Sequence, residues 1–487
     1  MNDLLKKHAR LLAITAGILA ALFFFFVNPF GVDAKAKLVL GIAALMISWW
    51  VLEAMPLAVV ALLPLVIFPL LHINSIKETA KAYSDSIIYL FMGGFFLGMA
   101  IEKWHLHKRI ALSIIKLTGT NGNSIVLGFI LSTGFLSMWL SNTATTMMMF
   151  PIASSVIVVI SQHAGNSGNL KNFSLTLMMA IAYASNFGGI ATIIGTPPNV
   201  AYISHLNAHY KHSIDFINWM LLCAPLAILL LISLYFVMVK WLYPNRLTHN
   251  EEGKIFIDTE LEKMGKLSLQ EKRVLAVFGT TALLWITKDI INTSQKLVQL
   301  DDTIIALLGA ISLFIVPSGR SKEAPEERLL EWEDTKNMAW GILLLFGGGI
   351  ALAKALEDAQ LMQKLGQYIA SFATSNVLVL IFVVALVSVF LSEVMSNIAQ
   401  VIVMAPVISA VADALHINPL LLGIPMTLGA SCAGMLPMGT PPNAIVFSSG
   451  HIKLKHMLKT GFVMNIISVI LITLFCWLLL PLIVPKF

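Results

Sequence analysis

Apolar blocks long enough to cross a membrane as helices recur from one end of this sequence to the other. A helix needs about 20 apolar residues to cross a bilayer, and most of the long blocks are near that length; examples are Leu11–Phe30, Leu38–Val51, Met220–Val239 and Met464–Val484. Only 12% of the residues are charged, about half the ~25% of a soluble domain. The sequence therefore predicts an all-α polytopic membrane protein embedded in the lipid bilayer, with no separate soluble domain.

The apolar pattern predicts eleven transmembrane helices. They lie at about 11–30, 37–55, 57–73, 85–104, 174–205, 216–240, 272–290, 303–317, 338–358, 419–447 and 460–484. Two further stretches, 124–160 and 376–412, are too long for one crossing, and each carries a Ser-Asn pair at its middle. A straight helix would leave that pair in hydrocarbon, whereas a turn there buries it inside the protein. Each stretch is therefore expected to be a re-entrant hairpin.

Basic residues predict the orientation of the chain. The loops on one side of the expected spans hold more Lys and Arg, among them Lys108, Arg109, Lys263 and Arg273. The positive-inside bias places that side in the cytoplasm. We therefore expect a multi-pass protein of the cell (inner) membrane, with the N-terminus inside and the C-terminus outside. The net charge of +6 is spread over these short loops, so no nucleic-acid partner is expected.

The two hairpin stretches belong to an internal repeat. The segment Leu136–Pro151 (LSMWLSNTATTMMMFP) matches Leu391–Pro406 (LSEVMSNIAQVIVMAP) at a spacing of 255 residues. Gly195-Thr-Pro-Pro-Asn199 returns as Gly439-Thr-Pro-Pro-Asn443 at a spacing of 244 residues. Each half contains an odd number of expected crossings, so the second half should lie upside down relative to the first. Inverted-topology repeats are common in transporters, which bind substrate at the midplane between the repeats.

This repeat divides the chain into four expected parts. They are an N-terminal helix (1–36), a first repeat (37–243) with a broken helix at 174–205, a cytoplasmic linker (244–271), and a second repeat (272–487) with a broken helix at 419–447. The linker is interpreted as a solvated polar connection.

The repeated motifs suit a small cation and a small anion. Proline disrupts the helix before it and frees carbonyl oxygens, which join serine hydroxyls and asparagine amides as hard oxygen ligands. A helix that starts after each hairpin tip points its N-terminus at the site and favours an anion. Neither motif contains Lys or Arg, so a bound cation would supply the positive charge that the anion needs.

Glu393 stands within the second hairpin, where the first hairpin has Met138. A carboxylate inside a membrane suggests function, either as a proton carrier or beside a cation. Equally, it could hold the hairpin in place through hydrogen bonds. The sequence shows no nucleophile motif, phosphate loop or metal cluster, so we expect no enzyme activity.

At these motifs the chain resembles the divalent anion/sodium symporters. The resemblance covers nearly the whole chain after the first helix and includes Trp50-Val-Leu-Glu-Ala-Met-Pro56, Glu102-Lys-Trp-His-Leu-His-Lys-Arg109 and both repeated motifs. It implies a homodimer with a scaffold domain and a transport domain that moves like an elevator. It also implies about two Na⁺ sites, with ligands at the positions Ser137, Ser141, Asn142 and Gly195, and Ser392, Met395, Asn397 and Gly439.

The same resemblance implies that substrate carboxylates bind at the tips and the adjacent breaks. The matching positions are Asn142, Thr143, Thr196, Pro197, Asn397, Ile398, Thr440 and Pro441. Ile398 departs from the family, which usually has threonine there. Isoleucine cannot donate a hydrogen bond, and a lost bond to a charged group matters by about 1.5–3 kcal/mol. Sodium-coupled symport of a C4-dicarboxylate such as succinate is the leading hypothesis. Sulfate or another anion as substrate, or anion exchange without net sodium coupling, remain alternatives.

Overall fold

The computed structural model describes residues 2–28, 31–119, 121–164, 168–211, 214–245, 247, 251–295, 297–319, 327–371 and 376–483. Within these ranges the regular elements are all helices, as the sequence predicts. Nine of the described helices are long and apolar enough to cross a membrane, and further apolar helices are shorter. The fold is therefore that of a polytopic helical membrane protein. The finer expectation of eleven crossings and two re-entrant hairpins stays a prediction.

The first half of the chain carries the helices up to the polar connection. They are α1 (Asn2–Val27), α2 (Ala34–Val51), α3 (Leu57–Val60), α4 (Leu63–Leu70), α5 (Ile76–Lys81), α6 (Ser86–Lys103), α7 (Leu106–Thr118), α8 (Gly122–Ser137), α9 (Asn142–Ala164), α10 (Gly168–Gly189), α11 (Pro197–Tyr210) and α12 (Phe216–Tyr235), which continues as a π-helix over Phe236–Leu242.

The second half carries the remaining helices, from the connection to the C-terminal end. They are α13 (Glu251–Met264), α14 (Leu269–Ser294), α15 (Asp302–Ile315), α16 (Trp340–Asp358), α17 (Leu361–Ala370), α18 (Val377–Leu391), α19 (Asn397–Ala414), α20 (Leu420–Ala430), α21 (Pro441–Phe447) and α22 (Leu454–Ile483). Short 3₁₀ turns lie at Ala82–Ser84 in the first half and at Trp332–Asn337 in the second.

Helices break at both repeated motifs. Helix α8 ends and α9 begins around the first Ser-Asn pair, and α18 and α19 are separated in the same way around the second. The Gly-Thr-Pro-Pro-Asn segments separate α10 from α11 and α20 from α21. In both segments the threonine has an extended backbone and the first proline opens the next helix, where proline is well tolerated because its missing N–H would have no helical partner.

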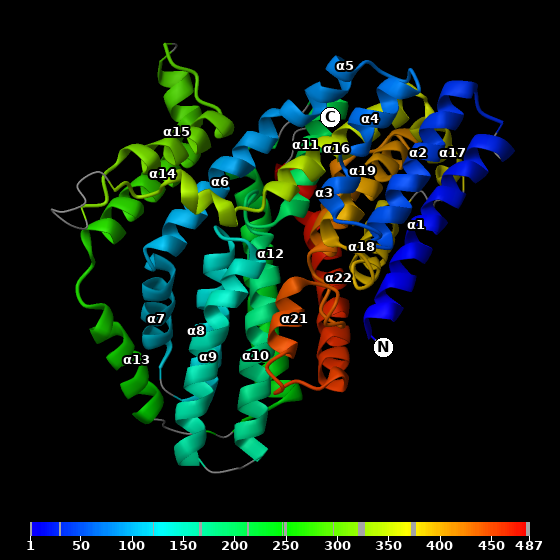
Figure 1. Cartoon of the computed structure of the whole chain (residues 1–487). Coiled ribbons are helices and arrows are strands. Elements are labelled where there is room, and N and C mark those ends of the chain that lie inside the picture. Colours follow the sequence, from blue (N-terminus) through cyan, green and yellow to red (C-terminus); the bar gives the residue numbers. More distant parts are fainter. Residues whose placement is uncertain are drawn as a thin grey trace.

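The two hairpins and the two broken helices pack against one another. Helix α8 packs on α10 and α18 packs on α20, so each hairpin lies beside the broken helix of its own half. In addition, α21 packs on α9 and α11 packs on α19. Helices α8, α9, α10, α12, α21 and α22 form the long block in the lower part of Figure 1. Each hairpin therefore touches the broken helices of both halves.

The stretch expected to cross at 57–73 consists of two short helices, α3 and α4. Pro56 precedes the first helix, and Pro64 lies at the start of the second. Proline lacks the N–H that a helix interior requires, which accounts for the interruption between them.

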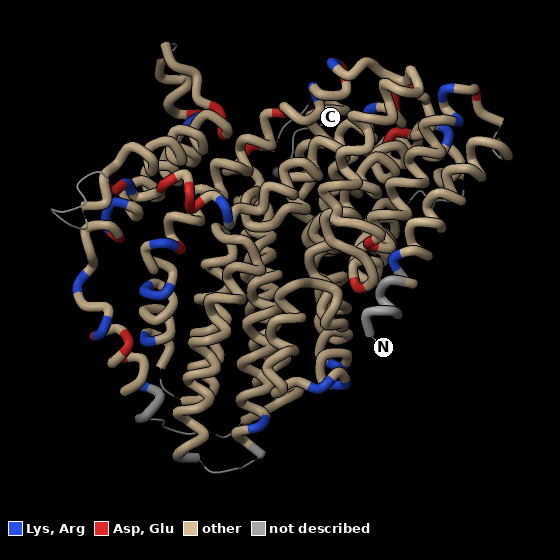
Figure 2. The backbone as a smooth tube through the Cα atoms, viewed as in Figure 1, with Lys and Arg blue, Asp and Glu red and all other residues tan. Residues whose placement is uncertain are grey.

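The polar connection at 244–271 contains a docked helix, in contrast to the solvated linker that the sequence suggested. Helix α13 packs on α7 and α9, and Figure 2 shows basic positions along α7 and both basic and acidic positions along α13. Lys108 Nζ lies 2.8 Å from a Glu260 carboxylate oxygen, and Lys116 Nζ lies 2.7 Å from Asp258. The ion pairs from Lys108 and Lys263 hold the pKa of Glu260 below its usual range. Opposite charges at matching positions thus explain why this segment docks.

The junction that comes after α13 depends on Arg109. Its guanidinium lies 2.6 Å from Glu271 and donates to the Met264 and Gly265 carbonyl oxygens. Arg109→Gln should destabilise the protein by about 3 kcal/mol, because it leaves the nearly buried Glu271 carboxylate without its charged partner. The control is Lys263→Ala, which removes an exposed pair with Glu260 and should cost about 1 kcal/mol or less. Thermal unfolding of the purified proteins measures both. Equal unfolding midpoints for the two variants would contradict the structural role of Arg109.

Candidate functional site

The tip of the first hairpin holds a serine and an asparagine in direct contact. Ser137 Oγ donates a hydrogen bond of 2.8 Å to Asn142 Oδ1, and both residues are buried. Ser141 Oγ accepts from the Ala144 N–H at 3.3 Å, as a residue at the start of a helix commonly does. Thr143 comes next in the first turn of α9 and is half-buried. Two side-chain oxygens of types that bind Na⁺ therefore meet at this tip.

The first broken helix comes close to the same tip. A Cβ atom at Gly195 would lie 2.9 Å from the Ser137 carbonyl oxygen, and one at Gly189 would lie 2.2 Å from Asn142 Oδ1. Gly195 therefore requires glycine, since a side chain would clash with backbone, and a side chain at Gly189 would displace the Asn142 amide from its place at the tip. The structure thus brings together Ser137, Asn142 and Gly195, three of the four positions named for the first Na⁺ site. Thr196 is buried and Pro197 is half-buried at the start of α11.

The tip of the second hairpin repeats the serine–asparagine contact. Ser392 Oγ lies 2.7 Å from Asn397 Oδ1 and 2.5 Å from the Ala430 carbonyl oxygen. Ser392 and Met395 are buried and Asn397 is half-buried. The same geometry at two tips, 255 residues apart in sequence, shows that the repeated motif produces a repeated local structure.

Glu393 connects the second hairpin to the second break. Its carboxylate accepts hydrogen bonds from the N–H groups of Gly434, Met435 and Leu436 at 2.8, 2.8 and 3.0 Å, and from Asn465 Nδ2 at 2.7 Å. All four partners donate, and only an ionised carboxylate accepts at both of its oxygens without itself donating. The structure therefore shows hydrogen bonds of the kind expected if Glu393 holds the hairpin in place.

The asparagines that end the two Gly-Thr-Pro-Pro-Asn motifs stabilise the unwound segments. Asn199 Nδ2 donates to the Thr192 carbonyl oxygen at 2.8 Å and lies 3.4 Å from those of Gly189 and Ile190. Asn443 Nδ2 similarly donates to the Leu436 and Ala433 carbonyl oxygens at 3.2 and 3.5 Å. Both asparagines are fully buried. Their amides replace hydrogen bonds that the broken helices have lost.

The candidate cation and substrate positions differ in burial. Ser137, Gly195, Ser392 and Gly439 are buried. By contrast, the substrate candidates Thr143, Pro197 and Ile398 are half-buried and Pro441 is exposed, while Asn397, a candidate for both, is half-buried. Thr440 is buried, and its hydroxyl accepts from the Asn443 N–H at 3.4 Å. The side chain of Ile398 packs beside two apolar clusters, one of which unites α1 to α4 with α16.

Asn186 is a central residue that the sequence analysis missed. It lies on α10, is almost fully buried, and contacts both Asn142 and Thr440. It belongs to neither repeated motif, and the position nine residues before Gly439, which corresponds to it in the second half, is Ala430. Comparison of the two halves therefore gives no signal at this position. Among the described residues no hydrogen bond joins the two hairpin tips directly, and Asn186 links the first tip to the second break.

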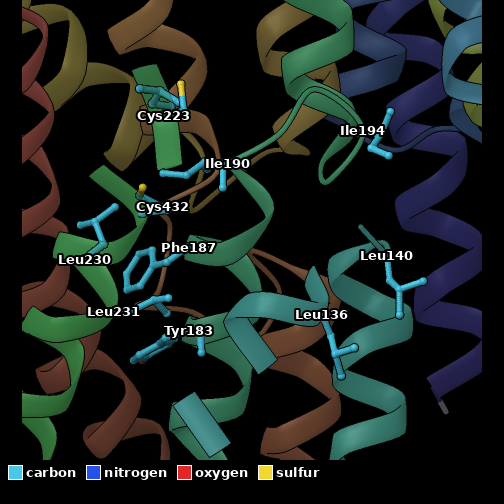
Figure 3. Close-up of a cluster of buried hydrophobic side chains, with 14 of the residues drawn as sticks. Leu136, Leu140, Tyr183, Phe187, Ile190, Ile194, Cys223, Leu230, Leu231 and Cys432 are labelled. Carbon is cyan, nitrogen blue, oxygen red and sulfur yellow. The ribbon is translucent and has the colours of Figure 1, made fainter. Parts of the chain in front are cut away.

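A cavity of about 890 Å³ lies away from these residues. It is bounded by α5, the end of α11, and helices α16, α17 and α19, and its lining carries both acidic and basic side chains. None of the substrate or cation candidates lines it. The candidate site is instead surrounded by close apolar packing. Figure 3 shows Leu136 and Leu140 at the first tip, with Tyr183, Phe187 and Ile190 on α10 and its break.

Comparison with known proteins decides the family. Residues 5–483 match the family model described as the sodium:sulfate symporter transmembrane region. The chain belongs to this family, the divalent anion/sodium symporters. The resemblance seen in the sequence is thereby confirmed, and the chain is a transporter rather than an enzyme.

Relatives within the symporter family align along nearly the entire chain. The sodium-dependent dicarboxylate transporter SdcS of Staphylococcus aureus (strain MRSA252) is 36% identical over 480 residues, which cover 96% of this chain and 91% of that protein. The protein of the same description from Staphylococcus saprophyticus is 36% identical over 458 residues, covering 93% and 88%.

Solved structures share the fold at much lower identity. The YdaH transporter of Alcanivorax borkumensis has a TM-score of 0.59 at 13% identity and covers 90% of this chain and 98% of its own. MtrF of Neisseria gonorrhoeae has a TM-score of 0.55 at 14% identity, covering 85% and 84%. At these identities the similarity concerns the fold alone.

The role of Glu393 can be tested directly. Glu393→Gln replaces an acceptor oxygen by an NH₂ group that faces backbone donors, so it should destabilise the protein by about 2–3 kcal/mol. The matched control is Glu102→Gln, at an exposed carboxylate near the end of α6, which should leave the unfolding midpoint unchanged. Thermal unfolding and the pH dependence of transport are measured together. A normal midpoint in Glu393→Gln, with transport that no longer depends on pH, would instead identify Glu393 as a proton carrier.

Proposed function

We propose that this transporter is a sodium-coupled symporter of a small divalent anion, most simply a C4-dicarboxylate such as succinate. The observation that carries the proposal is the paired serine–asparagine contact at both hairpin tips, Ser137 with Asn142 and Ser392 with Asn397. The sodium dependence and dicarboxylate substrate in the description of the staphylococcal relatives support it.

The cation chemistry comes from the atoms at each tip. We assign one Na⁺ to Ser137, Ser141, Asn142 and Gly195, and a second to Ser392, Met395, Asn397 and Gly439. Hydroxyl, amide and carbonyl oxygens are hard ligands of the type that binds hard cations. The Ser137 hydroxyl now donates its proton to the asparagine oxygen, and the single proton of Ser392 is shared between Asn397 Oδ1 and the Ala430 carbonyl oxygen. With Na⁺ present, the hydroxyl turns its proton away, so that both oxygens face the cation.

The anion chemistry comes from helix ends. Helices α9 and α19 begin at the two tip asparagines, and helix N-termini favour negative charge. Thr143, Thr196, Pro197, Thr440 and Pro441 flank these ends, with Ile398 beside the second. None of these positions is Lys or Arg, so the two Na⁺ ions provide the positive charge that holds a divalent anion. Sodium and anion would therefore bind together.

The transport motion we propose is of the elevator type. The hairpins and broken helices interlock as one unit, which would form the moving transport domain. Helices α1 to α4 and α16 share an apolar cluster, on which Met395 and Ala399 of the second hairpin also pack, and these helices would belong to the scaffold. Homodimerisation through the scaffold, the inverted repeat and the cytoplasmic N-terminus are part of the same proposal.

Ile398 favours a second candidate substrate. Its side chain offers no hydrogen bond to a second carboxylate, so sulfate or an anion with one carboxylate and an apolar end would fit this position better. Anion exchange without net sodium coupling is a further alternative in mechanism.

Uptake into proteoliposomes tests the proposal. An inward Na⁺ gradient should drive accumulation of radiolabelled succinate, because cation and anion share one charge-neutralised site. Sulfate, added as a competitor, reports the second substrate candidate. Uptake that is indifferent to Na⁺ would contradict sodium coupling, and the absence of succinate uptake by folded protein would contradict the dicarboxylate.

The same assay includes variants of both tips. Asn142→Ala and Asn397→Ala should each abolish uptake, since each removes an oxygen from a Na⁺ site. Asn418→Ala is the control, because Asn418 caps α20 through the Leu420 N–H away from the tips. Normal uptake in either tip variant would remove that tip from the site.

Substrate choice is tested at Ile398. Ile398→Thr restores a hydroxyl donor and should lower the half-saturating succinate concentration by about tenfold relative to sulfate, as expected for one hydrogen bond to a charged group. Ile402→Thr is the matched control, since Ile402 lies one turn further along α19 and packs beside the same two clusters. An unchanged preference in Ile398→Thr, or an equal change in Ile402→Thr, would show that Ile398 does not face the substrate.

A further inference from the structure

One buried amide joins the first hairpin tip to the second break. Asn142 Nδ2 donates to Asn186 Oδ1 at 3.4 Å, and Asn186 Nδ2 donates to Thr440 Oγ1 at 3.3 Å. Only 1% of Asn186 is exposed, so no water competes freely for its amide. The side chain thus lies between an assigned Na⁺ ligand and a substrate candidate.

The hydrogen bonds from Ser137 to Thr440 form a chain in which each side chain donates to the next. Ser137 donates to Asn142, Asn142 to Asn186, and Asn186 to Thr440. Thr440 Oγ1 also accepts from the Asn443 N–H, so both lone pairs of the hydroxyl are in use. Within the described part of the chain, the Thr440 hydroxyl donates no hydrogen bond. Its proton is therefore available to an anionic oxygen.

We propose that Asn186 is a positioning residue that couples Na⁺ binding at the first tip to anion binding at Thr440. The proposal rests on the sodium-coupled symport proposed above. A cation on Asn142 Oδ1 withdraws electron density from that amide and makes its NH₂ group a stronger donor. Hydrogen bonds in a chain polarise one another inside a protein, so the effect passes through Asn186 to Thr440. This hydrogen-bonded linkage adds to the electrostatic attraction between Na⁺ and the anion.

The linkage through Asn186 is restricted to one of the two Na⁺ sites. The corresponding position in the second half is Ala430, which has no side-chain donor. The carbonyl oxygen of Ala430 accepts from Ser392 instead. The two tips therefore share their serine–asparagine contact, while only the first reaches across to the other half through a side chain.

Na⁺ titrations of thermal unfolding test the coupling in purified full-length protein. The half-saturating Na⁺ concentration is measured with and without saturating succinate, and the ratio of the two values reports the coupling. Wild-type protein should show a ratio of at least about fivefold, the lower end of typical coupling between sites. Asn186→Leu has nearly the same volume and should lower the ratio clearly below the wild-type value, leaving only the direct electrostatic attraction between Na⁺ and the anion. Because the ratio is taken within each variant, general destabilisation cancels.

Ser185→Ala is the matched control. Ser185 is the buried neighbour on α10 and accepts from Thr146 of α9 at 2.9 Å, but it does not contact Thr440. It should keep the wild-type ratio. Asn186→Ser replaces the leucine variant if that protein does not fold. Its hydroxyl is too short to span both partners, so it should also give a ratio clearly below the wild-type value.

The outcomes separate this proposal from the proposed function. A wild-type ratio in the Asn186 variants, or an equal loss in Ser185→Ala, overturns the role of Asn186 while sodium-driven uptake by the wild type still stands. The absence of sodium-driven uptake in the wild type overturns the proposed function and this inference together.

Discussion

Unwound backbone inside a membrane protein needs hydrogen-bond partners from the protein itself, because hydrocarbon offers none. The rest of the site depends on how this chain meets that requirement. In each half a buried asparagine donates to the carbonyl oxygens of the broken segment: Asn199 in the first half and Asn443 in the second. These amides let the chain leave the helix next to a hairpin tip. Serine, asparagine and carbonyl oxygens can then meet at one place.

In each half, one hydrogen bond between corresponding positions connects the hairpin to the broken helix. The side chain takes part from the broken helix in the first half and from the hairpin in the second. In the first half the Thr192 hydroxyl donates to the Met138 carbonyl oxygen. The corresponding positions in the second half are Leu436 and Glu393, and there the Glu393 carboxylate accepts from the Leu436 N–H. Either arrangement fixes the break against the tip. This explains how the second half can have a glutamate where the first half has a methionine, without a change in the local fold.

The sequence predicted the features that arise from local chemistry. Polar pairs within apolar stretches and Pro-Pro after glycine located the helix breaks, since proline and unsatisfied polar groups act on the chain around them. It did not predict the features that depend on distant contacts. The docking of α13 requires Lys108 and Lys116 of α7 to face Glu260 and Asp258. Asn186 is likewise recognised only once the fold places it beside Thr440.

Unequal burial suggests how charge is balanced at the proposed site. The cation positions Ser137 and Ser392 are fully buried, whereas Thr143 and Ile398 on the anion side are partly open. A lone cation at the buried positions would carry a large desolvation cost, and an anion at a helix end without basic side chains would be held weakly. Each ion lowers the cost of binding the other. A site without Lys or Arg therefore has a physical reason to move its ions together, and a repeated motif provides two cation positions for one divalent anion.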